Sequence, residues 1–371
     1  MKTNENAVKE PLVRIVKRSP LLWWQSCLAR VGSVVAALIV CAAVIVFMTG
    51  ENPISIYATI IDGAVGTERR VWSLLQNVAM LLCVSLAVTP AFKMRFWNIG
   101  AEGQVLIGGL ATAMCMILFG KTLPPVILFP VMIVASIIAG AIWAVIPAIF
   151  KAVWNTNETL FTLMMNYIAM QIVAFFVYRF SVPKGAGQIG VINGNTNAGW
   201  FPALFGKSYL LNIIIVAVIT VVMYVYLKYS KHGYELTVVG ESENTARYIG
   251  INVKKVIIRT MLVSGAICGI AGLLLVSGTD HTITRDTAAG RGFTAIMVSW
   301  LAKFNPFYMI ITSLLLVFLQ KGAGEISTVF GLNSSFSDII TGIIIFFIIG
   351  SEFFINYRLI VRGINAKGEK E

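Results

Sequence analysis

The chain is built around Phe96-Trp97-Asn98-Ile99-Gly100-Ala101-Glu102-Gly103-Gln104, a polar stretch between the apolar runs 74–88 and 105–119. It places a carboxylate, two amides and two glycines where a membrane would surround them. A charged side chain at that depth costs about 2.5–3.5 kcal/mol on insertion scales, so Glu102 should face protein or a water-filled cavity. The stretch therefore predicts a broken membrane segment that lines a path or locks a helix bundle.

The composition is that of a polytopic membrane protein. Hydrophobic residues make up 57% of the chain and charged residues 12%, against roughly a half and a quarter in soluble domains. Apolar runs of about 20 residues recur from end to end, which is enough for helices to cross the ~30 Å hydrocarbon layer. We predict an all-α bundle of about ten transmembrane helices. No long polar block is left over to form a separate enzyme domain.

The apolar runs give the expected crossings. The third begins inside the polar stretch and ends near Phe119. The run 293–302 is the shortest and fits either a crossing or a re-entrant segment. The others lie at about 32–50, 72–91, 124–149, 159–178, 208–227, 256–278, 306–320 and 336–351.

Basic residues set the expected orientation. With the N-terminus inside, most of the 29 lysines and arginines fall in inner loops and at the two ends, as the positive-inside rule requires. This predicts a cytoplasmic N-terminal segment 1–31, a transmembrane domain 32–351 and a cytoplasmic tail 352–371. Within the domain we expect an external loop 181–207 and a cytoplasmic loop 228–255. The net charge of +12 then reflects topology and not nucleic-acid binding.

Asn98, Glu102 and Gln104 are the first candidate site residues. Asn98 and Glu102 are four residues apart, so on a helix they would share a face. Gly100 and Gly103 can free backbone groups to meet a ligand or a neighbouring helix. Two interpretations stay open for Glu102: a hydrogen bond that locks the bundle, or direct contact with a substrate or gate.

A second polar set opens the fifth span. Asn155-Thr156-Asn157-Glu158-Thr159 supplies N-cap candidates with a carboxylate in the first turn. Thr159, Thr162 and Asn166 then follow i, i+3, i+7 spacing, a polar stripe that should face the bundle interior. Pathway lining and interhelical bonding both explain it. Ser335-Phe336-Ser337-Asp338 has capping-box spacing at the last span.

Helix packing and a polar loop have their own signals. Gly265-xxx-Gly269 and Gly140-xxx-Ala144 put small residues one turn apart, so that helix backbones can approach closely. In the inner loop, Ser242 or Asn244 should begin a helix of about two turns that Gly250 ends. Such a helix could dock a partner or be a plain surface helix.

Several patterns carry no chemistry. Gly185-Ala186-Gly187-Gln188-Ile189-Gly190 matches a dinucleotide fingerprint without the strand and helix that the fingerprint needs. His232 and His281 fall on opposite faces by this topology, so they cannot share a metal. The five cysteines lack CxxC spacing and are expected to be small core residues. We therefore predict no catalytic residue and no metal site.

Three segments together resemble one family of membrane proteins. They are Asn98-Ile99-Gly100-Ala101-Glu102-Gly103-Gln104, then Asn157-Glu158-Thr159-Leu160-Phe161-Thr162-Leu163-Met164-Met165-Asn166-Tyr167, then residues 240–251. They are similar to the permease subunits of bacterial ATP-binding-cassette importers for ribose-type sugars, branched-chain amino acids and nucleosides. The sequences of these segments are most similar to those of the nucleoside and simple-sugar branch. Trp97 stands where phenylalanine is more usual, and Thr245 where a small alanine is usual.

The resemblance implies a division of labour between subunits. It implies a substrate path between two permease subunits (the same or a related chain), a separate ATPase subunit that binds ATP and Mg²⁺, and an extracellular substrate-binding lipoprotein. No cofactor is expected on this chain. The loop 228–255 would be the coupling loop that docks on the ATPase. By resemblance, Gly240, Glu243, Ala246 and Gly250 would lie in the coupling helix, with Arg247 beside them.

The resulting hypothesis is a permease subunit in the bacterial cytoplasmic membrane. It would move a nucleoside, or otherwise a simple sugar, inward by alternating access powered by ATP hydrolysed on the partner. A branched-chain amino acid ranks third. The alternative is an ion-coupled secondary transporter or a channel for a small polar solute. A secondary carrier should offer buried ion-binding groups and often an internal repeat. The sequence shows one convincing buried carboxylate and no clear repeat.

Overall fold

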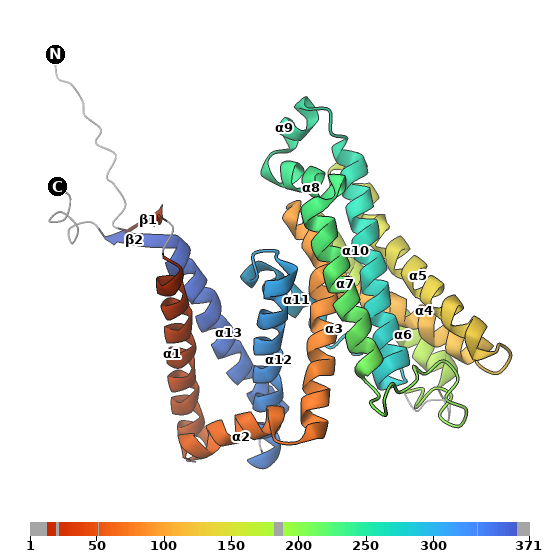
Figure 1. Cartoon of the computed structure of the whole chain (residues 1–371), viewed down its shortest axis with the longest axis horizontal. Helices are drawn as coiled ribbons and strands as arrows, with labels where there is room; N and C mark the ends of the chain where they lie inside the picture. Colours follow the sequence, from red (N-terminus) through yellow and green to blue (C-terminus); the bar gives the residue numbers. More distant parts are fainter. Residues whose placement is uncertain (1–12, 20–21, 51, 182–187, 332, 362–371) are drawn as a thin grey trace. The chain divides into compact units, whose positions relative to one another are not determined.

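A computed structural model describes residues 13–19, 22–50, 52–181, 188–331 and 333–361. Nine of the described helices are long and apolar enough to cross a membrane, as the recurring apolar runs predict (Figure 1). They are α1 (Trp23–Thr49), α3 (Glu68–Lys93), α4 (Ala101–Phe119), α5 (Pro125–Trp154), α6 (Glu158–Phe180), α7 (Leu210–Tyr229), α10 (Val253–Leu275), α12 (Pro306–Val329) and α13 (Ser334–Asn356).

Shorter elements join these spans. They are β1 (Val13–Lys17), α2 (Pro53–Val65), α8 (Lys231–Glu241), α9 (Glu243–Tyr248), the π-helical turn η1 (Val276–Asp280), α11 (Arg291–Leu301) and β2 (Tyr357–Val361). α2 lies between the first two expected crossings, where no helix was predicted, because its 13 residues are too few to be read as a crossing. α11 is the uncertain run 293–302, and it is a short helix.

The described chain divides into two compact units. The first contains Met1–Gly63 and Leu319–Glu371, and the second Ala64–Phe318. In the first unit α1 packs on α13, and β1 pairs antiparallel with β2, with Val13 opposite Val361. The two outermost described strands of the chain therefore lie side by side.

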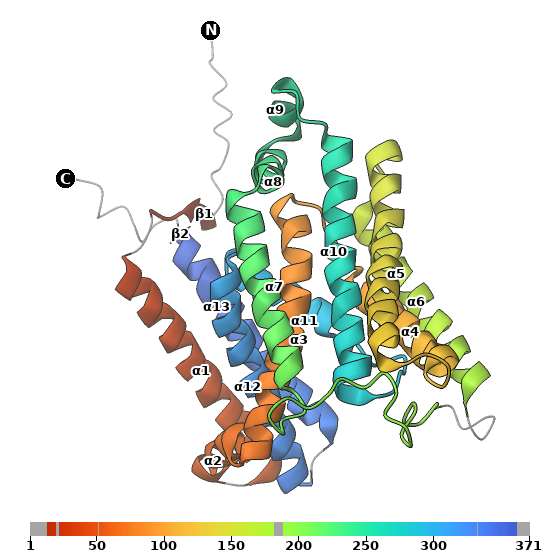
Figure 2. The ribbon, with the colours of Figure 1, turned by 45° about the vertical axis from the view of Figure 1, so that its right-hand side comes forward.

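α10 is the central helix of the second unit, and it packs on α3, α4 and α5 (Figure 2). Its small residues make this possible. Gly265 lies against Gly140 and Ala144 of α5, and a Cβ atom on Gly269 would collide with the backbone of α5. The predicted small-residue pairs thus face one another, and the backbones of α5 and α10 approach closely.

α11 follows an interrupted course through the same unit. After η1, residues 281–290 form turns and no regular helix. α11 then runs along α3 from Arg291, which contacts Asn77, to Ser299, which contacts Thr89. Its 11 residues span only about 16 Å. The segment 281–301 is therefore helical only in its second half, from Arg291 onward.

Candidate functional site

The polar stretch begins in a tight turn between α3 and α4. Arg95 has a left-handed backbone with φ 60°, and the Phe96 amide donates back to the Ala91 carbonyl at 2.9 Å. α4 begins at Ala101, so the third span does start inside the stretch, as predicted. Asn98, however, precedes the helix, and the prediction that it shares a helical face with Glu102 is wrong.

Asn98 ties this turn to the central helix. Its side chain is fully buried, and its amide nitrogen donates to Ser264 Oγ on α10 at 3.2 Å. Its oxygen accepts from the Gly100 amide at 3.1 Å and from Gln104 Nε2 at 3.2 Å. Asn98 therefore organises the turn from inside, with Gln104 reaching back to it from the first turns of α4.

Glu102 points to a different element, the beginning of α11. Its carboxylate oxygens accept from the backbone amides of Gly290 and Gly292, each at 2.7 Å. Its exposed fraction is only 3%. The first amides of a helix have no partner within the helix, and a carboxylate there also meets the positive end of the helix dipole. Glu102 is thus the N-terminal cap of α11, supplied by another helix.

Glycines on either side of Arg291 make this cap possible. Gly290 has φ +71°, a left-handed conformation that favours glycine. A Cβ atom on Gly292 would lie 2.5 Å from the Glu102 amide nitrogen. Sequence reasoning missed α11 as the partner of Glu102. The Gly290-Arg291-Gly292 sequence just before an apolar run was the signal that could have pointed to it.

The polar stripe of α6 binds the same turn. Asn166 accepts from the Gly103 amide at 2.8 Å and donates to the Ile99 carbonyl at 2.9 Å. Thr162 accepts from the Ile99 amide at 3.2 Å. Both side chains are buried, whereas Thr159 is half-buried. The structure therefore brings the first two motif segments together, and it gives Thr162 and Asn166 interhelical bonds.

The predicted caps have different outcomes. Asn157 caps α6 by accepting from the Leu160 amide at 3.2 Å, and Glu158 lies in the first turn, as expected. α13 instead begins at Ser334 with Asn333 as its cap, accepting from the Ser335 amide. The capping-box prediction that started at Ser335 is wrong because the helix begins earlier.

A second polar cluster surrounds η1 and was not predicted. Gln76 Nε2 on α3 donates to Thr279 Oγ1 at 2.5 Å, and Asn212 Nδ2 on α7 reaches the same atom at 3.4 Å. Arg291 Nη2 donates to Asn77 Oδ1 at 3.0 Å. π-helical turns are frequent at functional sites. Amide side chains inside two apolar runs were the missed signal.

The described part of the loop 188–207 closes over this cluster. The Ile192 amide donates to the His281 carbonyl at 2.8 Å, and the Trp200 and His281 rings stack with centroids 3.8 Å apart. Burial lowers the pKa of His281. The glycine-rich match at 185–190 lies largely outside the described residues. Within the described residues no group of His, Cys, Asp and Glu is arranged to hold a metal ion.

The loop 228–255 forms two helices at the end of α7 and α10 (Figures 1 and 2). Ser242 separates α8 from α9 and caps α9 by accepting from the Thr245 amide at 3.2 Å. Glu243 and Arg247 pair at 3.4 Å on the exposed side of α9, and Ala246 is fully buried. The short helix begun by Ser242 is as predicted, and α8 was not foreseen.

Two residues that the resemblance assigns to the coupling helix lie outside α9. Gly240 is in α8, and Gly250 follows the end of α9 with φ +85°. Gly240 faces the backbone of the α3–α4 turn, where an added Cβ would collide with the Lys93 carbonyl and lie 3.4 Å from Met94 Cα. α8 thus rests directly on the turn that carries Asn98 and leads into α4.

Long apolar helices around an interrupted segment, with polar contacts buried between the spans, define a multi-pass membrane permease. The chain belongs to the family described as branched-chain amino acid transport system / permease component, which matches residues 71–349. Members of this family are transport subunits and not enzymes. The matched region contains the turn, the cap of α11 and both helices of the loop 228–255.

Related proteins are similar along most of their length. One is a glucose ABC transporter permease protein, TsgB13 from Haloferax volcanii, 28% identical over 91% of this chain and 90% of its own. Another is a nucleoside ABC transporter permease protein, NupB from Lactococcus lactis subsp. cremoris, 27% identical over 82% of this chain and 86% of its own. A guanosine ABC transporter permease protein, NupP from Bacillus subtilis, is 29% identical over 83% and 89%. No solved structure matches the chain.

Proposed function

We propose that this permease imports a nucleoside, or otherwise a simple sugar, by alternating access driven by a separate ATPase. The contact between α8 and the α3–α4 turn carries the proposal, because it joins the exposed helices α8 and α9, which we expect on the cytoplasmic side, to the buried polar junction. The relatives support the substrate class: two are named for nucleosides or guanosine and one for glucose. A branched-chain amino acid, in the family description, ranks third.

The partners follow from the family and from the shape of α9. An ATPase subunit, with ATP and Mg²⁺ bound on it, would dock on α9, and a second permease chain would complete the path. An extracellular lipoprotein would deliver the solute. α9 offers a suitable surface, since Tyr248 is 92% exposed and Ile249 is 52% exposed at its end. Large apolar side chains that are this exposed beside charged ones are typical of a protein contact.

The mechanism uses contacts between rigid helices. Closure of the ATPase pair would push α9 and α8, and Gly240 would pass the displacement to the turn at Lys93. The turn would move α4 through Asn98 and α11 through Glu102. In this mechanism Asn98, Glu102, Gln104, Thr162 and Asn166 hold the moving junction together, with Thr159 at its edge. Glu243, Ala246 and Arg247 form the docking helix, while Gly240 and Gly250 position it.

Reconstituted transport tests the proposal against ion-coupled transport. The chain would be purified with candidate ATPase and lipoprotein subunits from the same organism and placed in proteoliposomes with labelled guanosine, glucose or leucine. We expect uptake of guanosine, or of glucose, that requires ATP hydrolysis. Uptake that needs no ATPase and follows a proton or sodium gradient would instead establish the secondary-carrier alternative.

A further inference from the structure

The outward face of α6 carries a polar group where a lipid-facing helix should have none. Gln171 lies near the middle of α6 (Glu158–Phe180), and its side chain is exposed. Among the described residues, nothing hydrogen-bonds its amide. Polar side chains within membrane spans normally face the bundle interior or water. The buried face of α6, with Thr162 and Asn166, is already occupied by the α3–α4 turn, and Gln171 lies on a different face.

Neighbouring spans show how unusual this position is. Every exposed residue of α5 is apolar, and those of α7 are apolar until Lys228 at its end. Ile138 and Val222, near the middles of α5 and α7, are 51% and 58% exposed. These surfaces suit lipid chains, whereas Gln171 interrupts the apolar outer surface of α6.

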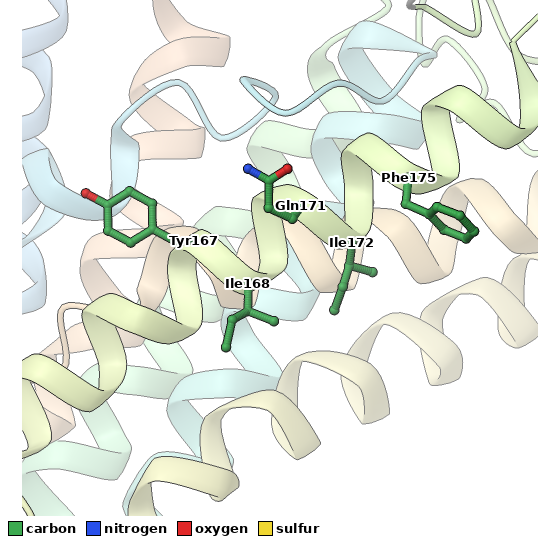
Figure 3. Close-up of a pocket in the computed structure, with 5 residues that line it drawn as sticks. All are labelled: Tyr167, Ile168, Gln171, Ile172 and Phe175. Atoms are coloured by element: carbon green, nitrogen blue, oxygen red, sulfur yellow. The ribbon is translucent and has the colours of Figure 1, made fainter.

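The same face is hollowed and lined by aromatic rings. A hollow of about 450 Å³ is bounded by Tyr167, Ile168, Gln171, Ile172 and Phe175, all on α6. Figure 3 shows the Tyr167 ring and the Gln171 amide on one side of the helix, and Ile168 and Ile172 on the other. Tyr167 is 61% exposed and Phe175 70% exposed. The hollow is open, and its lining is almost entirely apolar, with the Gln171 amide at its rim.

These groups match a solute that has a flat apolar face and a polar edge. An aromatic ring stacks on the face of a nucleobase or on the apolar face of a sugar. The primary amide of Gln171 offers both donors and an acceptor to hydroxyl groups or to a base edge. A hollow with walls from one helix cannot enclose a solute by itself.

We propose that Tyr167, Gln171 and Phe175 line the solute path between this chain and a second permease subunit, and that Gln171 hydrogen-bonds the passing nucleoside or sugar. This inference rests on the proposed import function. It places the solute contact on the exposed face of α6, and not on the buried face where the sequence placed the pathway candidates Thr162 and Asn166. The second subunit supplies the facing wall.

Thiol labelling of the reconstituted complex tests this placement. Gln171→Cys and the control Val222→Cys would be treated with a charged, water-soluble methanethiosulfonate and separately with a lipid-soluble maleimide. The wild type serves as the blank because its described cysteines are buried. We expect the water-soluble reagent to label position 171 and not position 222, with labelling at 171 reduced at least several-fold by excess guanosine or glucose.

Three results would overturn the inference. They are labelling of position 171 by the maleimide alone, labelling by neither reagent, and water-soluble labelling that no solute reduces. A transport assay separates this test from the proposed function. If the wild-type complex imports no nucleoside or sugar, the proposed function fails whatever the labelling shows. If it imports one and position 171 gives any of those results, only the inference fails.

Solute affinity provides a second readout. Gln171→Leu removes the amide but keeps a side chain of similar size. We expect the KM for uptake to rise about tenfold, which corresponds to the loss of one hydrogen bond worth about 1.4 kcal/mol. Gln171→Asn should recover part of that loss, and Val222→Leu should leave the KM unchanged. An unchanged KM in Gln171→Leu would contradict contact between the amide and the solute.

Discussion

Glu102 acts as a structural cap within the polar stretch. Its carboxylate satisfies two amides at the start of α11, and its burial leaves no room for a solute beside them. A half-helix that begins inside a bundle offers an anion site at its N-terminus. Here the protein's own carboxylate fills that site, so Glu102 holds α4 and α11 together.

Replacing Glu102 by Gln should destabilise the protein. The amide keeps one acceptor but turns an NH₂ group toward a backbone amide that needs an acceptor. We expect a loss of about 1–3 kcal/mol in the free energy of unfolding, measured by thermal unfolding in detergent. Glu241→Gln is the control, because Glu241 is exposed and should change stability by less than about 0.5 kcal/mol. Equal stability of the two variants would contradict the capping role.

His232 should give the fold a measurable pH dependence. It lies in α8, its Nδ1 is 2.5 Å from Tyr226 Oη, and burial lowers its pKa, an effect that Glu235 partly opposes and Arg259 reinforces. The folded state therefore binds this proton less readily than the unfolded state. Stability is present above about pH 6.5, the ordinary pKa of histidine, and is lost as the pH falls below it.

Thermal unfolding of the wild type and His232→Gln from about pH 7.5 to 5.5 would measure this dependence across the ordinary histidine pKa. We expect a smaller fall in midpoint for the variant, because His281 remains and its pKa is also lowered. Identical pH profiles would show that His232 does not contribute.

For single residues, the sequence predicted which polar side chains are buried better than it predicted their hydrogen-bond partners. Polar groups at membrane depth need partners, so burial of Asn98, Glu102 and Asn166 followed from their positions. Their partners depend on which helices pack together. Glu102 reaches residues far along the chain, and no local spacing identifies α11. The predicted common face of Asn98 and Glu102 failed because helix α4 begins only at Ala101.

Among elements, α8 is the link between the exposed loop and the buried junction. Gly240 gives it a direct backbone contact with the α3–α4 turn. Spans were predictable because about 20 apolar residues suffice to identify them. α2, α8 and α11 are shorter than that, and only packing against neighbours makes them helical. Length alone therefore could not reveal them.

Gly240→Ala should impair coupling between the loop and the spans. The added methyl group would collide with the Lys93 carbonyl and lift α8 from the turn. We expect the rate of uptake by reconstituted complexes to fall at least tenfold, which corresponds to an increase of about 1.4 kcal/mol in the activation barrier. The chain should still insert into the membrane. Gly324→Ala is the matched control, because nothing lies within 4 Å of its added Cβ. Undiminished uptake by Gly240→Ala would contradict this route.

The packing of α5 on α10 should be equally sensitive to one methyl group. Gly269→Ala places its Cβ against the Ser136 backbone, and overpacking of this kind typically costs about 1–3 kcal/mol. Gly342→Ala, with nothing within 4 Å, should be neutral or stabilising by about 0.5–1 kcal/mol. Thermal unfolding in detergent compares the two, and a stable Gly269→Ala variant would exclude close contact of these helices.

For the whole molecule, the polar junction and the exposed face of α6 have separate roles. In the proposed mechanism the junction would transmit movement from α8 and α9, and the α6 face around Gln171 would meet the solute. The family and the membrane fold could be predicted from three motif segments and the apolar runs. The face around Gln171 could not, because the sequence shows a single glutamine in an apolar helix and does not reveal which side of that helix is free.

Coupling through α9 is the central claim, and one substitution tests it most directly. Ala246→Pro breaks α9 because proline lacks the amide donor and clashes with the preceding turn. Lys231→Pro is the control, since the first position of a helix such as α8 tolerates proline. ATP hydrolysis stimulated by the loaded binding protein would be measured with both variants in proteoliposomes. We expect Ala246→Pro to insert normally but to lose stimulated hydrolysis and uptake, while Lys231→Pro retains both. Normal hydrolysis and uptake in Ala246→Pro would contradict coupling through α9.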